Sequence, residues 1–386
     1  MHLPLYCLLP LCLLAAGAAA SARAETPPAG HPGPTCPPER PVVPELSWRH
    51  VREWGVEGRA WPELARRRWY DRFPAAAEGR VTAAVWRLSR DSTGMMFRFR
   101  TDAPQIWVRY TLLKAKLASP NMSAIGASGI DLYARGADGR WRWAGNSRPD
   151  AQTVVQPLVW GYDIGPGLRE YAAYLPLANG VEELEVGVPP TARFEPVAPR
   201  PEKPIVFYGT SITHGSAASR PGLVHTAILG RRLDRPVVNL GFGGNGRMDA
   251  AVGEFLVKID AAAYVIDCLP NLYPHEVTER CAPLVRMLRR ARPDTPIVLV
   301  EDRRNPNAWL LPERDRHHTD NHAALRTEFA RLRQEGVTGL YYLAGDALLG
   351  DDHEGTTDGS HPNDLGFMRQ ADAFEPVLRA ALAGSP

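Results

Sequence analysis

The sequence predicts an α/β fold, a flavodoxin-like three-layer α/β/α sandwich that follows an all-β, jelly-roll-like domain. Three observations carry this prediction. Residues 204–384 alternate short apolar runs with longer helical patterns, which is typical of a parallel sheet covered by helices. Residues 46–188 contain short runs of alternating polarity separated by Gly-rich turns. Residues 189–203 between them are Pro-rich and are expected to form a stiff linker.

The C-terminal half contains five apolar runs of strand length, each followed by a segment with helical spacing. The predicted strands are Ile205–Tyr208, Val237–Leu240, Ala263–Asp267, Ile297–Val300 and Gly339–Leu343. The predicted helices lie near 221–233, 248–259, 275–291, 318–335 and 364–382. Strands without polar alternation are buried on both faces, so the sheet is expected to be parallel.

The N-terminal half has the pattern of antiparallel strands. FRFRT at 97–101 and IWVRYT at 106–111 alternate apolar and polar residues, as strands with one buried face do. Shorter runs at 129–133, 141–144 and 184–188 are separated by turns. A β-sandwich or jelly roll is the architecture that fits this pattern.

The first residues have the pattern of a secretory signal. Residues 1–24 are apolar and then small, and they end in Ala22-Arg23-Ala24, which predicts cleavage after Ala24 and a periplasmic or secreted protein. No Lys or Arg stands at the head, so a membrane anchor is the alternative. Pro4 and Pro10 break the apolar run, and we expect no stable membrane insertion. Residues 25–45 form a Pro-rich leader.

Composition excludes several classes of partner. The chain has 386 residues, 44% of them hydrophobic and 23% charged, with a net charge of +2, so neither nucleic acid nor an anionic membrane is expected to bind. Beyond the signal, Cys36, Cys268 and Cys281 form no disulfide framework and have no metal-ligand spacing. His318 and His322 lie four apart, a zinc-compatible spacing, but a solvated start of a helix is the preferred interpretation. No metal is predicted.

Ser211 is the first candidate for chemistry. It lies in IVFYGTSITHG at 205–215, where a buried strand ends in a turn of small residues. Side chains just beyond such a strand face the crevice in which α/β sheets bind ligands. A serine is also common in ordinary turns, so this position alone does not make Ser211 a nucleophile.

Asp358 and His361 supply the partners that a serine nucleophile needs. They stand three apart in TTDGSHPND at 356–364, ahead of a helical pattern. From one loop, the carboxylate can orient the imidazole while its other nitrogen faces a serine. The alternative is a helix-capping loop with Asp358 or Asn363 as the cap, and both interpretations can hold at once.

These segments together resemble a known family. GTSIT, NLGFGGNG at 239–246, CLPN at 268–271 and DGSHP at 358–362 are similar to the four blocks of the SGNH, or GDSL-type, esterase superfamily, in the same order. Thr210 stands where Asp is commonest in the first block. GIDLY at 129–133 and VWRLSRDSTG at 85–94 resemble the GxDLY domain that precedes some SGNH hydrolases.

The resemblance assigns an oxyanion hole and removes a competing interpretation. Gly241 to Gly246 spell the dinucleotide pattern G-x-G-x-x-G, but they follow the second strand of the domain, and no suitably placed acidic residue follows. The family pattern instead implies that the N–H groups of Ser211 and Gly244 and the side-chain amide of Asn271 bind an oxyanion. It implies no cofactor.

The sequence therefore predicts an exported serine esterase that removes short acyl groups, with O-acetyl on carbohydrates as the expected substrate. A lipase or lysophospholipase is one alternative, and a non-catalytic carbohydrate-binding protein is another. The partner is a small-molecule or saccharide ester, and no pattern predicts an oligomeric state. Four tryptophans could stack on sugars but are more simply core residues: Trp54, Trp61, Trp107 and Trp160.

Overall fold

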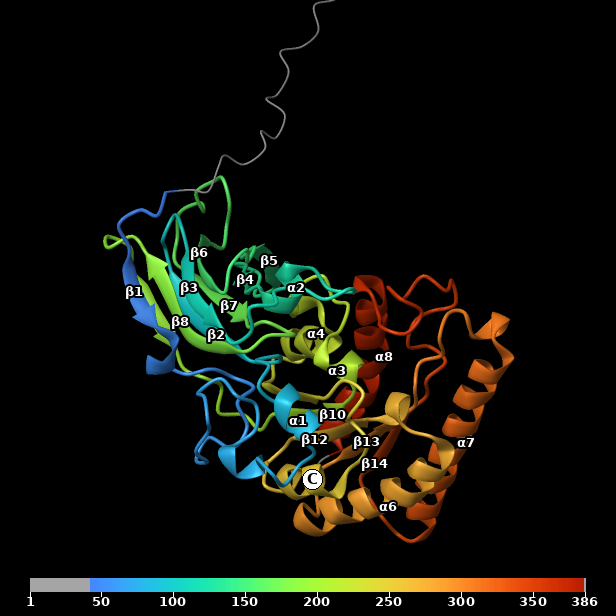
Figure 1. Ribbon diagram of the computed structural model, residues 1–386. Coiled ribbons are helices and arrows are strands. Elements are labelled where there is room, and N and C mark those ends of the chain that lie inside the picture. The colour runs from blue at the N-terminus through green and yellow to red at the C-terminus, as the bar shows by residue number, and fades with distance from the viewer. Residues whose placement is uncertain (1–41, 385–386) are drawn as a thin grey trace, which may run out of the picture. The chain divides into compact units, whose positions relative to one another are not determined.

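The computed structural model describes residues 42–384 and confirms the predicted fold class (Figure 1). The predicted signal, 1–24, and nearly all of the leader lie outside the described residues. Within the described part of the chain, no helix is both long enough and apolar enough to cross a membrane.

The C-terminal half is built on a five-stranded parallel sheet. Its strands, in chain order, are β10 (Ile205–Gly209), β11 (Val237–Gly241), β12 (Ala263–Asp267), β13 (Ile297–Val300) and β14 (Leu340–Leu343). In space their order is β11-β10-β12-β13-β14, the flavodoxin-like order, and β10 pairs in parallel with both β11 and β12. The order reverses beside β10, so the ligand crevice of this fold is expected at its carboxyl end.

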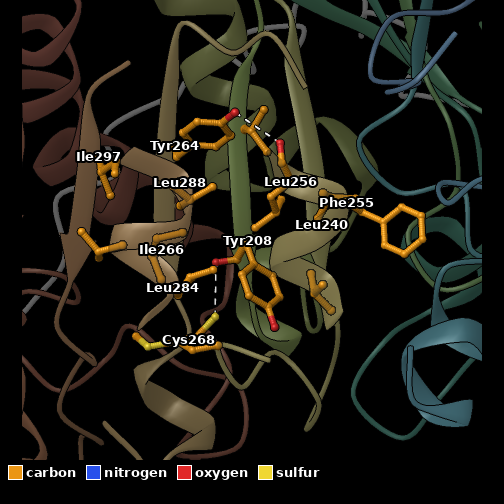
Figure 2. Packing of buried hydrophobic residues seen from close by; sticks show 14 of the residues in the cluster. Tyr208, Leu240, Phe255, Leu256, Tyr264, Ile266, Cys268, Leu284, Leu288 and Ile297 are labelled. Carbon is orange, nitrogen blue, oxygen red and sulfur yellow. Dashed lines mark hydrogen bonds between the residues drawn. The ribbon is translucent and has the colours of Figure 1, made fainter. Parts of the chain in front are cut away.

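Helices cover both faces of this sheet. One face carries α5 (Ala250–Leu256), α6 (Pro274–Ala291) and α7 (Pro312–Gln334), and the other carries α4 (His225–Arg232) and α8 (Asp364–Ala383). Strand β10 is buried on both sides. Val206 and Tyr208 point towards the layer of α5, α6 and α7 (the first layer), and Ile205 and Phe207 point towards the layer of α4 and α8. Figure 2 shows Tyr208 among the first layer's apolar side chains.

The N-terminal half is a sandwich of two antiparallel sheets, ordered β1-β8-β3-β6 and β5-β4-β7-β2-β9. Its strands are β1 (Ser47–His50), β2 (Met96–Thr101), β3 (Trp107–Leu112), β4 (Asp131–Arg135), β5 (Trp141–Asn146), β6 (Thr153–Pro157), β7 (Arg169–Tyr174), β8 (Val181–Val188) and β9 (Phe194–Val197). Side chains from both sheets, such as Phe99 and Val186, form one core.

Short helices complete the chain. The α-helices are α1 (Ala83–Leu88), α2 (Ala124–Ser128) and α3 (Ser211–His214), and the 3-10 helices are Val51–Glu53, Ala75–Ala77, Pro221–Leu223, Leu269–Asn271 and Ala308–Leu310. Strand β9 pairs with β2, so four residues of the predicted linker lie in the sandwich. Of the four tryptophans, Trp61 and Trp107 are buried, as the core interpretation requires.

Part of the N-terminal half packs into the core of the C-terminal half. Trp61 and Phe73 belong to the same buried cluster as Phe242 and Phe255. Phe73 stacks on Phe242 with ring centroids 5.4 Å apart, and the Trp61 indole N–H donates to the Phe255 carbonyl at 3.0 Å. The α/β core is therefore closed by residues that precede the second strand of the sandwich.

Arg72 joins the two halves through main-chain carbonyls. It is 1% exposed, and its guanidinium donates to the carbonyls of Asn239 and Gly241 at 3.0 and 2.8 Å, and to those of Leu88 and Asp91. Asn239 and Gly241 lie in β11, directly before the glycine loop. A buried cation with several carbonyl acceptors avoids the cost of an unpaired charge.

We expect Phe73→Ala to lower the free energy of unfolding by about 3–5 kcal/mol, because it opens a cavity inside the α/β core. Chemical denaturation followed by tryptophan fluorescence measures this. Leu64→Ala, at a side chain that is 37% exposed, is the control and should change stability little. Equal, small effects of the two changes would show that this segment does not support the core.

Candidate active site

Ser211 is the first residue of α3 and follows the carboxyl end of β10. The Thr210 hydroxyl caps this helix by accepting from the Ile212 N–H at 3.3 Å, and Gly215 ends it with φ +106°. The departure from the usual Asp at this position thus keeps a capping oxygen. The first N–H groups of a helix have no partner within it, so the Ser211 N–H is not used by α3.

Ser211, His361 and Asp358 form a continuous chain of hydrogen-bond contacts. The Ser211 Oγ lies 2.9 Å from His361 Nε2, and His361 Nδ1 lies 2.8 Å from Asp358 Oδ2. Because a carboxylate only accepts, Nδ1 carries the proton and Nε2 is left to accept from the serine. The His361 side chain keeps 25% of its surface exposed, so a substrate can reach it. This arrangement can remove a proton from a serine that attacks a carbonyl.

The Asp358 loop positions its own carboxylate. Asp358 Oδ1 accepts from the backbone N–H groups of Ser360 and His361 at 3.1 and 2.8 Å. Burial would raise the pKa of Asp358, but hydrogen bonds from the His361 backbone, the His361 ring and Asn121 outweigh burial and hold it well below its usual range. The carboxylate is therefore charged at neutral pH.

The alternative interpretation of this loop holds as well. Asn363 Oδ1 accepts from the Gly366 N–H at 3.0 Å and caps α8. The cap is Asn363, while Asp358 contacts His361. The loop thus starts a helix and presents an imidazole with its orienting carboxylate.

The glycine loop after β11 lies against the serine. A Cβ on Gly243 would lie 3.3 Å from the Ser211 Cβ, which is tighter than ordinary contact. Gly244 has φ +68°, a conformation that favours glycine. Nothing lies within 4 Å of an added Cβ there, so this side of the loop is open. Gly244, the residue that the family pattern indicates, therefore follows Gly243 on a stretch of backbone that is open on this side.

Asn271 lies at the end of the 3-10 helix after β12 and contacts the glycine loop. With its amide turned so that Oδ1 accepts from the backbone N–H groups of Asn245 and Gly246, both at 3.2 Å, two donors are satisfied. The reverse orientation gives one bond from Nδ2 to the Gly246 carbonyl, at 3.3 Å. The first orientation is favoured because it makes two bonds, and it frees Nδ2 to donate to another acceptor. The glycine loop thus contacts Asn271 through Asn245 and Gly246, and at Gly243 it lies close to Ser211.

Beneath α3 lies a buried carboxyl group. The Thr213 hydroxyl donates to Asp267 Oδ2 at 2.7 Å, and Asp267 is 6% exposed. Burial raises the pKa of the Asp267 carboxyl to about 7, and the hydrogen bond from Thr213 opposes this rise. Asp267 ties the end of β12 to the helix that begins with Ser211.

Arg303 supports the other side of the site. Its guanidinium donates to the Ser360 carbonyl at 2.9 and 3.0 Å and to the Ser360 Oγ at 2.6 Å, and it pairs with Asp302. Ser360 lies between Asp358 and His361, so Arg303 holds the loop that carries them. Sequence reasoning missed Arg303, although its position just after β13, at the carboxyl edge of the sheet, was the available signal.

The interpretation of His318 and His322 as a solvated helix start is wrong. Both lie on α7, but they are only 3% and 0% exposed. His318 Nδ1 lies 3.0 Å from Asp302 Oδ2, and His322 Nδ1 lies 3.3 Å from Glu301 Oε2. They face inward because Glu301 and Asp302, which directly follow β13, are buried against α7. Among residues 42–384, no group of three or more His, Cys, Asp or Glu is arranged to hold a metal ion.

Comparisons with known proteins define the class. Residues 202–379 match the GDSL-like lipase/acylhydrolase family, and residues 46–194 match the GxDLY N-terminus of SGNH-hydrolase-type esterases. A candidate GDSL-like lipase from Bacteroides ovatus is similar over 88% of this chain and 98% of its own, with 33% identity and a TM-score of 0.82. A comparison with curated proteins gave no match.

Two further solved structures share the fold at lower identity. A salicylyl-acyltransferase from a tetracycline biosynthetic pathway is 20% identical, with a TM-score of 0.66 over 89% of this chain and 96% of its own. A family two carbohydrate esterase from Cellvibrio japonicus is 15% identical, with a TM-score of 0.58 over 88% of this chain and 98% of its own.

The fold and the comparisons define a serine ester hydrolase of the SGNH type. The chain belongs to the GDSL-like lipase/acylhydrolase family, in the branch with an N-terminal GxDLY domain.

The raised pKa of Asp267 gives a pH-dependent prediction. Its folded pKa of about 7 lies above its ordinary value of 3.8, so the neutral form is favoured in the fold. Between these values the unfolded chain has lost the proton while the folded chain keeps it, and stability falls as the pH rises. Asp267→Asn removes this titration and leaves an oxygen to accept from Thr213. Between pH 5 and pH 8 the wild type loses this stability and the variant does not. The free energy of unfolding of the variant, relative to that of the wild type, should therefore rise by roughly 1–3 kcal/mol over this range.

Denaturation at the two pH values measures the difference. Asp320→Asn, at an exposed position on α7, is the control and should show no comparable pH dependence. An effect of Asp267→Asn that is the same at pH 5 and pH 8 would contradict a neutral buried carboxyl.

Proposed function

We propose that this protein is an exported serine esterase that removes short acyl groups, in particular O-acetyl groups, from saccharides. The observation that carries the proposal is the chain of contacts from Ser211 Oγ to His361 and Asp358, at 2.9 and 2.8 Å. Ser211 attacks the ester carbonyl while His361 Nε2 takes its proton. His361 then gives this proton to the departing alcohol, and an acyl-serine remains.

Water completes the reaction by the reverse use of the same groups. His361 removes a proton from the water that attacks the acyl-serine, and returns it to Ser211 Oγ as the acid leaves. Asp358 holds the imidazole in the tautomer with the proton on Nδ1 and stabilises the imidazolium that forms. No proton passes to Asp358 in either half-reaction.

The oxyanion of each tetrahedral intermediate is assigned to the N–H groups of Ser211 and Gly244 and to Asn271 Nδ2. A Cβ on Gly243 would lie 3.3 Å from the Ser211 Cβ, and Asn271 is held by the backbone of the same loop, so the glycine loop links the three proposed donors. One donor of this kind commonly stabilises a transition state by about 3–4 kcal/mol. Glycines suit this loop because no side chain then blocks the approach of a substrate oxygen to the backbone N–H groups beside the serine.

The acyl side of the site favours a small group. Phe242 and Leu269 are two large apolar residues of the catalytic blocks, and both are 0% exposed in the core beneath the site. Burying a longer chain requires apolar walls, which yield about 0.8 kcal/mol per CH₂. The small residues around Ser211, such as Gly243 and Gly244, offer no such walls. An acetyl group needs none.

The alcohol side is assigned to a cavity of about 710 Å³ next to the site. It is bounded by Ser360 and Pro270, which adjoin His361 and Asn271, and its lining includes Tyr273 and His317. Tyr273 is 57% exposed, and its ring contacts His317 with centroids 5.4 Å apart. An exposed aromatic ring beside polar groups suits a sugar ring, which has apolar C–H faces and a polar rim.

Two other features bear on the substrate and location. The Cellvibrio japonicus carbohydrate esterase shares the two-domain fold at 15% identity. This likeness supports the fold and adds little support for the choice of substrate. Export rests on the signal pattern of residues 1–24, which would place the enzyme where polysaccharides occur.

The lipase alternative also has an observation in its favour. Trp309, Leu310 and Leu311 are 74%, 63% and 39% exposed, and Leu311 lines the same cavity. Exposed apolar residues beside a site could receive an acyl chain. The two functions differ in how the rate depends on chain length.

We expect kcat/KM on p-nitrophenyl esters to be highest for acetate and to fall by about tenfold or more at hexanoate, because the acyl side lacks apolar walls. Steady-state kinetics across acetate, butyrate, hexanoate and octanoate measure this. Ser211→Ala supplies the blank and should lose about 10³-fold or more in kcat. Rates that climb towards octanoate favour the lipase, and a fully active Ser211→Ala protein defeats the serine mechanism.

Tyr273→Ala tests the saccharide site separately. We expect KM for an acetylated xylo-oligosaccharide to rise by about 3–10-fold, because the stacking surface is lost, while p-nitrophenyl acetate is hydrolysed as before. The matched control is Tyr162→Ala, at a tyrosine that is 75% exposed on the β-sandwich. If Tyr273→Ala leaves both substrates unaffected, the alcohol does not occupy this cavity.

A further inference from the structure

One residue of the β-sandwich reaches the carboxylate of the catalytic loop. Asn121, in the segment between β3 and α2, donates from Nδ2 to Asp358 Oδ2 at 3.1 Å. The two residues are 237 positions apart in the chain. The same Oδ2 is the atom that lies 2.8 Å from His361 Nδ1. Asn121 therefore acts on the oxygen that orients the imidazole.

The turn around Asn121 fixes which atom of its amide faces Asp358. Ser119 and Met122 exchange two backbone hydrogen bonds, at 3.0 and 3.2 Å, and so close a tight turn with Asn121 inside it. The Ser119 hydroxyl donates to Asn121 Oδ1 at 3.0 Å. With Oδ1 engaged, Nδ2 is the amide atom directed at the carboxylate.

The turn is anchored next to the nucleophile. Met122 is 6% exposed and belongs to a cluster with Ile212, which follows Ser211, and with Phe367 of α8. Ala127 of α2 belongs to the same cluster. The position of Asn121 is thus set by packing against the elements that carry the serine and follow the histidine.

We propose that Asn121 is a positioning residue for Asp358, so that the GxDLY domain completes the active site. The inference rests on the proposed roles of Ser211, His361 and Asp358. Two backbone N–H groups hold Oδ1, and Asn121 holds Oδ2, so the carboxylate cannot pivot away from the ring. Such support matters because the Asp358 side chain is 36% exposed and water competes for its oxygens.

Charged side chains on the neighbouring segments have partners other than Asn121. Arg303 contacts Ser360, Lys114 pairs with Asp91 at 2.5 Å, and Asp364 accepts from the Ser219 N–H at 2.9 Å. Lys116 is exposed on the segment before the turn. None of these contacts is made by Asn121, so a change at Asn121 leaves them in place.

The test compares Asn121→Ala and Asn121→Asp in the full chain with p-nitrophenyl acetate. Asn121→Ala should lower kcat by about tenfold at unchanged KM, because a hydrogen bond to a charged group is lost. Asn121→Asp places a second carboxylate beside Asp358 and stabilises the imidazolium. It should therefore move the acidic limb of the kcat/KM profile to higher pH by about one unit. Ser123→Ala, on an exposed side chain that makes no capping bond at the start of α2, is the matched control and should match the wild type.

The outcomes separate this inference from the function on which it rests. If Ser211→Ala is inactive but neither Asn121 variant changes kcat or the pH limb, Asn121 does not position Asp358 and the esterase mechanism stands. A loss of activity in both variants that accompanies a lower melting temperature, with no shift of the limb, marks a purely structural role and overturns the inference. Full activity of Ser211→Ala overturns the proposed function itself.

Discussion

The closeness of the strand ends around Ser211 is the constraint on which the rest of the site depends. A Cβ on Gly246 would lie 1.8 Å from the Gly209 carbonyl oxygen, and one on Gly241 would lie 2.2 Å from the backbone nitrogen of His214. The Phe242 N–H donates to Gly209 at 2.9 Å and joins β10 to the loop after β11. Because no side chain fits between them, the loop passes directly over the turn that carries the serine.

The same constraint explains why the catalytic blocks were readable from the sequence. Glycines required by close approach, a serine after a buried strand and an Asp–His pair in one loop are local patterns, and the chain order of the strands fixes where they meet. Strands such as Ala263–Asp267 and Ile297–Val300 were predicted with the observed bounds because both faces are apolar. The proposed roles of Ser211, Asp358 and His361 remain predictions that the geometry supports.

What the sequence did not reveal depends on contacts between distant segments. Strands β1, β6, β7 and β9 were not predicted, since edge strands such as β1 and β9 are short and have little alternation. His318 is buried against Asp302, which lies in the segment after β13 and is distant from α7 in the pattern of the sequence. Asn121 lies in a loop with no local signal at all, and only the packing of Met122 on Ile212 brings it to Asp358.

The shared core of the two halves has a consequence for how the chain folds during synthesis. Trp61 precedes its partner Phe255 by 194 residues. At about 5–20 residues per second, roughly 10–40 seconds separate their emergence from the ribosome. During that interval Trp61 and Phe73 can contact each other but lack their partners in the α/β core, such as Phe255, so part of their apolar surface stays unburied. The segment that carries Trp61 and Phe73 therefore reaches its native packing only after the α/β domain has been synthesised.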